Sequence, residues 1–467
     1  MDRSVLLQAG KKVSATEQKE VPRTIRKISV KKLFGVFDHE IPMNLQERIT
    51  IIHGPNGFGK TVLLRFINAI FHGNYGVLRR IPYDTFRIDF DDGAFLSIKQ
   101  TREQAKDGTS QTTLFFETND KNSTKVTYPL SAPSYAVDSQ LLLDTIEHTI
   151  HYLERVGPDS WRDMRTMELL ENEEVIEKYA SQLPILVGRR ASIPDWLDHL
   201  TKSVSVRFIE AQRLILPTTY PPRPRRGTST QAVAQYASEL AQLIQNKLGE
   251  YGSLSQSLDR TFPTRLMKNG SFASGFSEED LSVKLKSLDE KRTRLTDAGL
   301  LPKEEAGAFG VSQIPTKVDD RTRGVLSVYV QDVEEKLSVF DDILAKIEFL
   351  KNVINERFPY KSVLITRDNG YTFVARDGTP LRPADLSSGE QHQLILLHEL
   401  LFKASANTLI LVDEPELSLH IAWQERFLSD LQQIVRLSHI HALLATHSPQ
   451  IISDRWDLTV ELKGPAL

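Results

Sequence analysis

One glycine-rich segment in the 467-residue chain has the composition and spacing to hold phosphate groups. Residues 54–61 read Gly-Pro-Asn-Gly-Phe-Gly-Lys-Thr and fit the pattern G-x-x-x-x-G-K-[ST]. The segment follows a short apolar run at 50–52 and precedes a stretch, 62–71, whose apolar residues recur with a helical period. Glycines let backbone N–H groups face phosphate oxygens, and a helix start adds its positive dipole end. The pattern therefore predicts a P-loop that binds ATP.

The side chains of this segment have separate expected tasks. The loop backbone at Asn56, Gly57 and Gly59 is expected to line the phosphate site. We expect Lys60 to reach the β- and γ-phosphates of ATP and the Thr61 hydroxyl to bind Mg²⁺.

A pair of carboxylates ends an apolar run near the other end of the chain. Residues 407–412 read NTLILV, and Asp413 and Glu414 follow. Two acids at the end of a buried strand are costly unless they serve a cation or a reaction. We expect Asp413 to hold Mg²⁺ and Glu414 to polarise the water that attacks the γ-phosphate.

A third segment, Leu386-Ser387-Ser388-Gly389-Glu390, stands before the long helical stretch 391–402. Taken alone, it is an ordinary helix N-cap. Together with the P-loop and the carboxylate pair, it resembles the signature motif of ABC ATPases, a variant of LSGGQ. The resemblance implies that Ser387, Gly389 and Glu390 complete the pocket of a second subunit by touching its γ-phosphate. It therefore predicts a head-to-tail homodimer, or a higher oligomer through the ATPase heads.

The same resemblance gives expectations for residues that follow other strands. His447, at the end of the apolar run 443–446, is expected to contact the γ-phosphate. Gln212 resembles the Q-loop glutamine, which senses Mg²⁺ and the attacking water, although Arg213 is an alternative functional residue. His420 stands where the family's D-loop has an aspartate, and this departure leaves its role open.

The elements that must position these residues lie at the two ends of the sequence. Short β-like runs surround the P-loop, and after residue 359 a hairpin pattern with Asn369-Gly370 leads into alternating helices and apolar strands. We expect an α/β fold: a P-loop ABC-type ATPase head, with a parallel sheet, helices and an antiparallel β lobe, and a long helical or coiled-coil insertion. The expected parts are a flexible tail over 1–24, an N-terminal ATPase half over 25–134, a helical subdomain over 135–203 with helices at 141–156 and 164–183, a Q-loop region with a basic Pro-rich loop over 204–228, the insertion over 229–358, and a C-terminal ATPase half over 359–467.

Heptad spacing supports the insertion. Two apolar positions recur four residues apart between 326 and 354, with a single break at Lys351. We expect these helices to pack antiparallel in an arm that projects from the head; a compact helical subdomain is the alternative. The two positions carry Leu326, Val333, Phe340, Ile347 and Ile354, and Val330, Leu337 and Leu344.

Composition limits the possible classes of protein. The chain has no cysteine, which excludes disulfides and thiolate zinc sites, and its net charge of -3 gives no overall attraction to nucleic acid. Arg223, Arg225 and Arg226 give a local hypothesis, a basic surface that contacts nucleic-acid phosphates or an acidic partner, and a solvated loop is the alternative. No apolar run approaches the roughly 18 residues of a membrane span, and the polar start lacks a signal sequence, so we expect a cytoplasmic protein without membrane association.

The C-terminal motifs resemble one branch of the ABC ATPases more narrowly. They are similar to the RecF/Rad50/OLD-like ATPases and, within them, to the PtuA ATPases of Septu and retron-associated anti-phage systems, which in Septu work with an HNH nuclease. Only 20 residues follow His447, too few for the Toprim domain of OLD nucleases, and we find no HNH motif. We therefore expect an ATP-hydrolysing subunit of a defence complex that regulates a separate nuclease. The alternative is a DNA-repair or chromosome-associated ATPase; a transporter engine is disfavoured because the insertion separates the motif halves.

Overall fold

The computed structural model describes residues 22–104, 110–119, 125–130, 139–150, 153–158, 160–163, 168–172, 175, 179, 193–210, 232–268, 276–302, 319–417 and 419–465. Our predictions for the N-terminal tail before residue 22, for Gln212 and Arg213, and for the basic loop that contains Arg223, Arg225 and Arg226 lie outside these residues.

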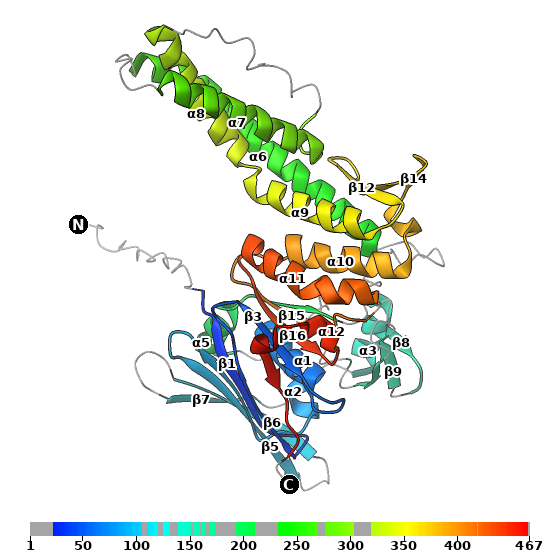
Figure 1. The fold of residues 1–467 in the computed structure, drawn as a ribbon. Coiled ribbons are helices and arrows are strands. Elements are labelled where there is room, and N and C mark those ends of the chain that lie inside the picture. The colour runs from blue at the N-terminus through cyan, green and yellow to red at the C-terminus, as the bar shows by residue number, and fades with distance from the viewer. Residues whose placement is uncertain are drawn as a thin grey trace, which may run out of the picture.

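A five-stranded parallel sheet forms the centre of the head (Figure 1). Its order is β11–β15–β16–β3–β17, and every neighbouring pair of strands is parallel. Strand β3 comes from the N-terminal part of the sequence and its neighbour β16 from the C-terminal part, so the two ends of the chain build one sheet, as predicted. The strands are β3 (Ile49–His53), β11 (Val206–Ile209), β15 (Leu409–Asp413), β16 (His441–Thr446) and β17 (Thr459–Glu461).

Both faces of this sheet are covered, which explains its uninterrupted apolar strands. In β15, Leu409 and Leu411 pack into one core, whereas Ile410 and Val412 pack into another. The first core includes α1 (Lys60–His72), and the second includes α10 (Ser388–Phe402) and α11 (Ile421–Ser438). Because strand side chains alternate between faces, one buried run supplies both cores.

An antiparallel sheet of six strands forms the predicted β lobe on the far side of α1. Its order is β2–β1–β4–β5–β6–β7. In β4, half-buried and buried residues alternate regularly, as expected for a strand that buries one face. The strands are β1 (Ile25–Leu33), β2 (Phe37–Pro42), β4 (Thr85–Phe90), β5 (Phe95–Gln104), β6 (Ser110–Asn119) and β7 (Lys125–Leu130); the short helix α2 (Gly76–Arg80) precedes β4.

The prediction of helices at 141–156 and 164–183 within the segment 135–203 is wrong in part. Helix α3 (Ser139–Thr149) ends earlier than predicted, and a three-stranded sheet follows. Strands β8 (Leu153–Arg155) and β10 (Glu168–Glu171) lie where helix was expected, and β9 (Ser160–Asp163) lies between the two predicted helices. The strands fully bury the Trp161 side chain in a small separate core. A short apolar run does not distinguish helix from strand by its spacing alone. Helix α5 (Asp195–Lys202) ends the segment.

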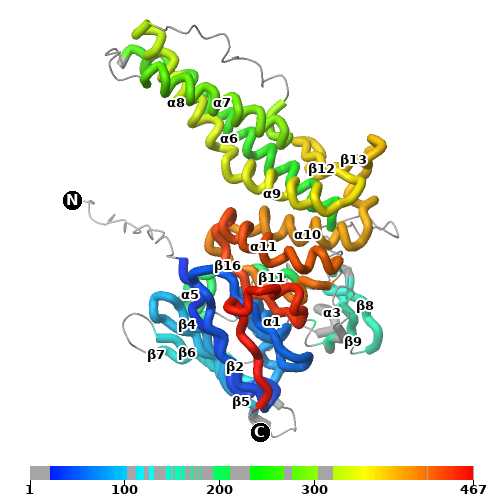
Figure 2. The backbone as a smooth tube through the Cα atoms, viewed as in Figure 1, coloured from blue at the N-terminus to red at the C-terminus, as the bar shows by residue number. Residues whose placement is uncertain are grey.

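The insertion forms an arm that projects from the head, as predicted (Figures 1 and 2). It contains α6 (Ala232–Lys268), α7 (Glu278–Asp297), α8 (Asp320–Ser338) and α9 (Asp341–Arg357). The heptad run is divided between two helices, since α8 ends before Val339 and Phe340, whereas α9 continues through Lys351, where the apolar pattern is interrupted. Phe340 is nevertheless fully buried, so the apolar seam continues across the break.

Ion pairs show the directions of the arm helices, and they correct one prediction. Partners further along α8 lie earlier on α6, so these two helices are antiparallel, as predicted. Partners further along α7 lie later on α8 and α9, so α7 runs parallel to them. The prediction that all these helices are antiparallel is therefore wrong for α7, because the heptad pattern carries no information about direction. The pairs are Arg265–Asp332 and Lys336–Asp259 for α6, and Lys284–Glu334 and Arg294–Glu348 for α7.

The arm returns to the head through a small sheet that lies beside the signature segment. Strand β12 (Lys361–Thr366) and strand β13 (Gly370–Ala375) form the predicted hairpin, in which Thr366 pairs with Gly370, and β14 (Pro380–Leu381) adds to it. Helices α10 and α11 then lie between the parallel sheet and the arm (Figure 1). Within the described residues, no helix is long and apolar enough to cross a membrane.

Candidate nucleotide site

The P-loop connects β3 directly to α1 and depends on glycine conformations. Gly59, the residue before α1, has φ = 90°, in the left-handed region that favours glycine. A Cβ at Gly59 would also lie only 2.5 Å from a methyl carbon of Leu33. Asn56 and Gly57 are exposed at the top of the loop, where a phosphate could reach their backbone. The loop therefore has the shape that the sequence pattern predicted.

The ammonium group of Lys60 lies inside this loop. Its Nζ donates to the carbonyl oxygens of Gly54, at 2.6 Å, and Pro55, at 3.2 Å. Burial lowers the pKa of Lys60, even though the carboxylates of Glu414 and Asp413 favour its charged form. A buried cation held by two neutral carbonyls is a site where an anionic phosphate would add the missing negative charge.

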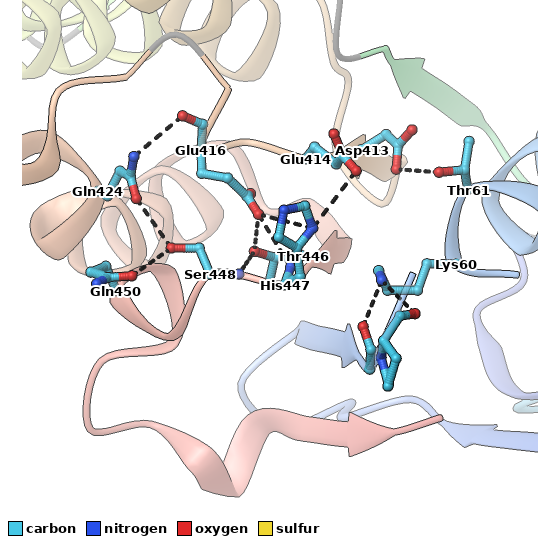
Figure 3. A network of polar contacts seen from close by, with 12 residues as sticks. Lys60, Thr61, Asp413, Glu414, Glu416, Gln424, Thr446, His447, Ser448 and Gln450 are labelled. Carbon is cyan, nitrogen blue, oxygen red and sulfur yellow. Dashed lines mark hydrogen bonds and ion pairs between the residues drawn. The ribbon is translucent and has the colours of Figure 1, made fainter. Parts of the chain in front are cut away.

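Thr61 and Asp413 meet although 352 positions separate them in the sequence. The Thr61 hydroxyl donates to Asp413 Oδ1 over 3.0 Å, because the start of α1 faces the carboxyl end of β15 (Figure 3). Burial raises the pKa of Asp413 to about 6, and the nearby Glu414 carboxylate adds to this effect. A hydroxyl oxygen and a buried carboxylate are ligands that fit Mg²⁺. The site residues therefore fit the predicted metal ion.

Glu414 and His447 leave adjacent parallel strands and approach each other. Glu414 Oε1 and His447 Nδ1 are 3.7 Å apart. Glu414 has φ = 44°, and its backbone N–H donates to the carbonyl of Ala445, which keeps β15 and β16 paired to their ends. A non-glycine residue in this backbone region is strained, and such strain is concentrated at functional sites.

A third carboxylate, Glu416, lies on the other side of His447 (Figure 3). Its Oε1 accepts hydrogen bonds from the Thr446 hydroxyl, at 2.7 Å, and from the backbone N–H of His447, at 3.1 Å. The same oxygen is 3.8 Å from His447 Nδ1. The sequence analysis gave Glu416 no role, and the signal available was a third acid immediately after Asp413, Glu414 and a proline.

The signature segment forms a self-contained helix start. Ser387 and Glu390 make a capping box at the N-terminus of α10: the Ser387 N–H and hydroxyl both donate to Glu390 Oε2 at 2.8 Å. Lys361 of β12 also donates to the Glu390 carboxylate. Burial raises the pKa of Glu390, but the bonds from Lys361 and Ser387 outweigh it and lower the pKa overall. Glu390 is thus buried, Gly389 half-buried and Ser387 exposed.

The structure does not bring this segment to the P-loop of its own chain. The contacts of Ser387 and Glu390 are those of the α10 start and of Lys361, whereas Lys60 and Thr61 contact the loop and Asp413. Direct contact of Ser387, Gly389 and Glu390 with a nucleotide therefore stays a prediction.

Gln212 lies outside the described residues, but the strand before it is well placed. In the register of β11 and β15, Ile209 lies opposite Val412, so Glu210 follows at the level of Asp413.

His420 is an N-cap: its Nδ1 accepts from the backbone N–H of Ala422 over 3.3 Å at the start of α11. That contact gives the position a structural task in place of the aspartate of the family pattern.

Together, the parallel sheet, the loop before α1 and the carboxylates after β15 define the class of the protein, a P-loop ATPase. Two family models each match more than half of the chain. Residues 207–453 match the family described as "AAA domain, putative AbiEii toxin, Type IV TA system", and residues 27–296 match the family described as "AAA domain". The chain therefore belongs to the AAA-domain family of ATPases.

Curated relatives agree with this class. The lipoprotein-releasing system ATP-binding protein LolD of Gluconobacter oxydans is 29% identical over 183 residues, which are 38% of this chain and 76% of the relative. LolD of Nitrobacter winogradskyi is 33% identical over 83 residues, 18% of this chain and 34% of the relative. The chain thus spans about a third of the second relative, and the similarity concerns ATP binding alone.

Solved structures of SMC heads align along most of the chain at low similarity. An Smc head domain with an extended coiled coil from Pyrococcus furiosus, bound to the C-terminal domain of ScpA, has a TM-score of 0.36 at 10% identity and covers 95% of this chain and 94% of its own. The SMC head domain from Thermotoga maritima has a TM-score of 0.30 at 10% identity and covers 92% of both chains. These scores add nothing to the functional argument.

Proposed function

We propose that the protein binds ATP with Mg²⁺ and hydrolyses it between the heads of a head-to-tail homodimer. One observation carries the proposal: the P-loop half of the site is assembled within one chain, whereas Ser387 of the signature half faces solvent. An ABC-type ATPase needs both halves at one nucleotide, so a second chain is the natural source of the missing half.

Each residue has a task in this proposal. The P-loop backbone and Lys60 would hold the phosphates, and Thr61 with Asp413 would hold Mg²⁺, which neutralises charge that develops on the phosphate oxygens. Glu414 would orient the attacking water and accept its proton, while His447, 3.7 Å from it, would contact the γ-phosphate. Gln212 is proposed beside Mg²⁺ and that water. Asn56, Gly57 and Gly59 complete the loop, and Ser387, Gly389 and Glu390 act from the partner chain.

The dimer can be tested without any assay of turnover. Glu414→Gln should retain ATP and Mg²⁺, because the amide keeps the shape of the side chain but is a poor base. Light scattering should therefore show a dimer of this variant with ATP and a monomer without it. Adding Ser387→Arg should abolish the ATP-dependent dimer. A dimer that forms equally well with the arginine present, or without ATP, would exclude the proposed interface.

We further propose that this ATPase is a subunit of an anti-phage defence complex and controls a separate nuclease of the HNH type. Support comes from the resemblance of segments 386–402, 407–428 and 443–452 to the Septu ATPases, and from a matched family whose description includes a type IV toxin–antitoxin system. The test is co-expression with neighbouring genes, purification of the complex and a DNA cleavage assay. Cleavage that changes between the native complex and its Lys60→Ala form supports control by ATP; a stable complex that never cleaves DNA contradicts it.

The arm favours one alternative, an SMC- or RecF-like ATPase that handles DNA. Its helices project from the head, where a long molecule can reach them. DNA binding by the isolated protein that strengthens with ATP and weakens steeply with salt would favour this alternative over the nuclease complex.

A further inference from the structure

Glu416 is a buried acid that the proposed mechanism does not use. Its side chain is only 8% exposed, and an ionised carboxylate in such a place needs hydrogen-bond donors. Oε1 has two donors, Thr446 Oγ1 and the His447 N–H, whereas Oε2 has no hydrogen-bond partner among the described residues. Both hydrogen bonds of the Glu416 carboxylate are with the end of β16 and the residue after it, Thr446 and His447.

The geometry points to a specific consequence for His447. The imidazole lies between two carboxylates, with Nδ1 3.7 Å from Glu414 Oε1 and 3.8 Å from Glu416 Oε1 (Figure 3). The close approach of Glu414 is to the imidazole ring of His447. Glu416 also accepts a hydrogen bond from the backbone N–H of His447, so it holds the backbone that carries the ring.

A second set of bonds connects the turn after Glu414 to the segment 446–448. Gln424 of α11 donates to the carbonyl of Leu419, at 3.0 Å, and accepts from the Ser448 hydroxyl, at 3.1 Å. The Leu419 N–H in turn donates to the carbonyl of Glu416, at 3.0 Å. The turn after Glu414 and the segment 446–448 are therefore joined at two points.

We propose that Glu416 is a positioning residue that holds His447 at its working distance from Glu414 and links it to the turn that precedes α11. This inference rests on the proposed hydrolysis of ATP.

The test is a double-mutant cycle between Glu416 and His447. Glu416→Ala should lower kcat about 10- to 100-fold, because loss of positioning in an active site costs that much, with little change in the Kd for ATP. Glu416→Gln should stay within roughly fivefold of the native kcat, because its amide oxygen can still accept both hydrogen bonds. In a His447→Ala background, Glu416→Ala should change kcat by less than about twofold, since residues that act through one group are not additive.

The controls separate positioning from folding. Glu425→Gln changes an exposed acid on α11, one residue from Gln424, and should leave kcat unchanged. Should Glu416→Ala not fold, Thr446→Val removes one donor to Glu416 and enters the same cycle. Full additivity with His447→Ala, or a native kcat in Glu416→Ala, would overturn the proposal.

Crystal structures of the variants distinguish this inference from the proposed function. If the native protein does not hydrolyse ATP, the proposed function fails. Glu416 still positions His447 if the histidine has moved in Glu416→Ala and not in Glu416→Gln. An unmoved histidine in Glu416→Ala refutes the inference whatever the native rate is.

Discussion

The P-loop half and the signature half of the candidate site satisfy their charged groups in opposite ways. On the P-loop half, burial raises the pKa of Asp413 to about 6, and Lys60 is held by neutral carbonyl oxygens. On the signature half, Lys361 and Ser387 bind the Glu390 carboxylate and lower its pKa despite its burial. The first half has charged groups that fit a cation and an anion, whereas the second is a helix start whose buried carboxylate already has its partners and whose Ser387 is exposed.

The largest expected effect tests the chemistry of the P-loop half. Glu414→Gln should lower kcat by about 10²- to 10⁴-fold, because the amide cannot accept a proton from the attacking water. The Kd for ATP should stay within a few-fold of the native value. Single-turnover hydrolysis and equilibrium binding of a fluorescent nucleotide measure the two quantities. Near-native turnover would remove Glu414 from the mechanism.

A smaller effect on stability tests whether the P-loop half is strained without its cation. Asp413 has a pKa of about 6 in the fold, against an ordinary value of 3.8, so stability falls as pH rises between these values. Asp413→Asn removes the charge and still offers an oxygen to Thr61. Without Mg²⁺, the substitution should stabilise the protein more at pH 7.5 than at pH 4.5, and the difference should be roughly 2 kcal/mol. A pKa shift of about two units corresponds to about 3 kcal/mol in total, and this pH range covers most of it.

Thermal unfolding of both proteins at the two pH values measures that difference. The same comparison at Glu390→Gln provides the contrast, since the pKa of Glu390 is lowered and its charge is stabilising. If Asp413→Asn shows no pH-dependent gain, the carboxylate is not destabilised in the fold.

The affinity for Mg²⁺ should depend on pH for the same reason. Protons compete for Asp413 below pH 6, so the apparent affinity for Mg²⁺ with ATP should fall up to about tenfold per pH unit there and level off above pH 7. Titration of Mg²⁺ into the ATP complex of the native protein measures this. ATP itself also titrates, and Asp413→Asn shows how much of the pH dependence comes from the nucleotide. Equal pH dependence in both proteins would contradict a role for Asp413 in holding the ion.

The smallest expected effect concerns the signature half. Lys361→Met removes one partner of the buried Glu390 carboxylate, and the loss of such a bond costs about 1 to 3 kcal/mol. The exposed ion pair of Arg382 with Asp385 lies nearby, and Arg382→Met is the matched control, with a smaller expected loss because water screens an exposed pair. Equal losses in the two variants would show that Glu390 is not held by Lys361.

Prediction from sequence succeeded where one short segment contains all the residues that determine its local structure. The P-loop pattern and the run from Leu409 to Glu414 fix their own local geometry, and parallel pairing then brings Thr61 and Asp413 together. Glu416 could not be given a role, because its bonds to Thr446 and His447 depend on which strand lies beside β15.

The two errors in the fold have related causes. Residues 168–171 were expected in a helix because a short apolar run lacks a clear period, and pairing with β9 decides the matter. The direction of α7 is set by contacts with α8, which heptad spacing leaves undetermined.

Subunit mixing tests the central claim, that Ser387 serves the P-loop of a partner. Lys60→Ala damages the P-loop half of a chain, and Ser387→Arg damages its signature half. In a head-to-tail dimer of one variant with the other, both lesions fall in one pocket, and the second pocket is intact. The account predicts that each variant alone is inactive and that the mixture regains tight ATP binding at one site per mixed dimer, with hydrolysis if one pocket suffices. Mixed dimers that show neither an intact binding site nor any activity would contradict it, and the 386–390 segment would then be a helix cap and no more.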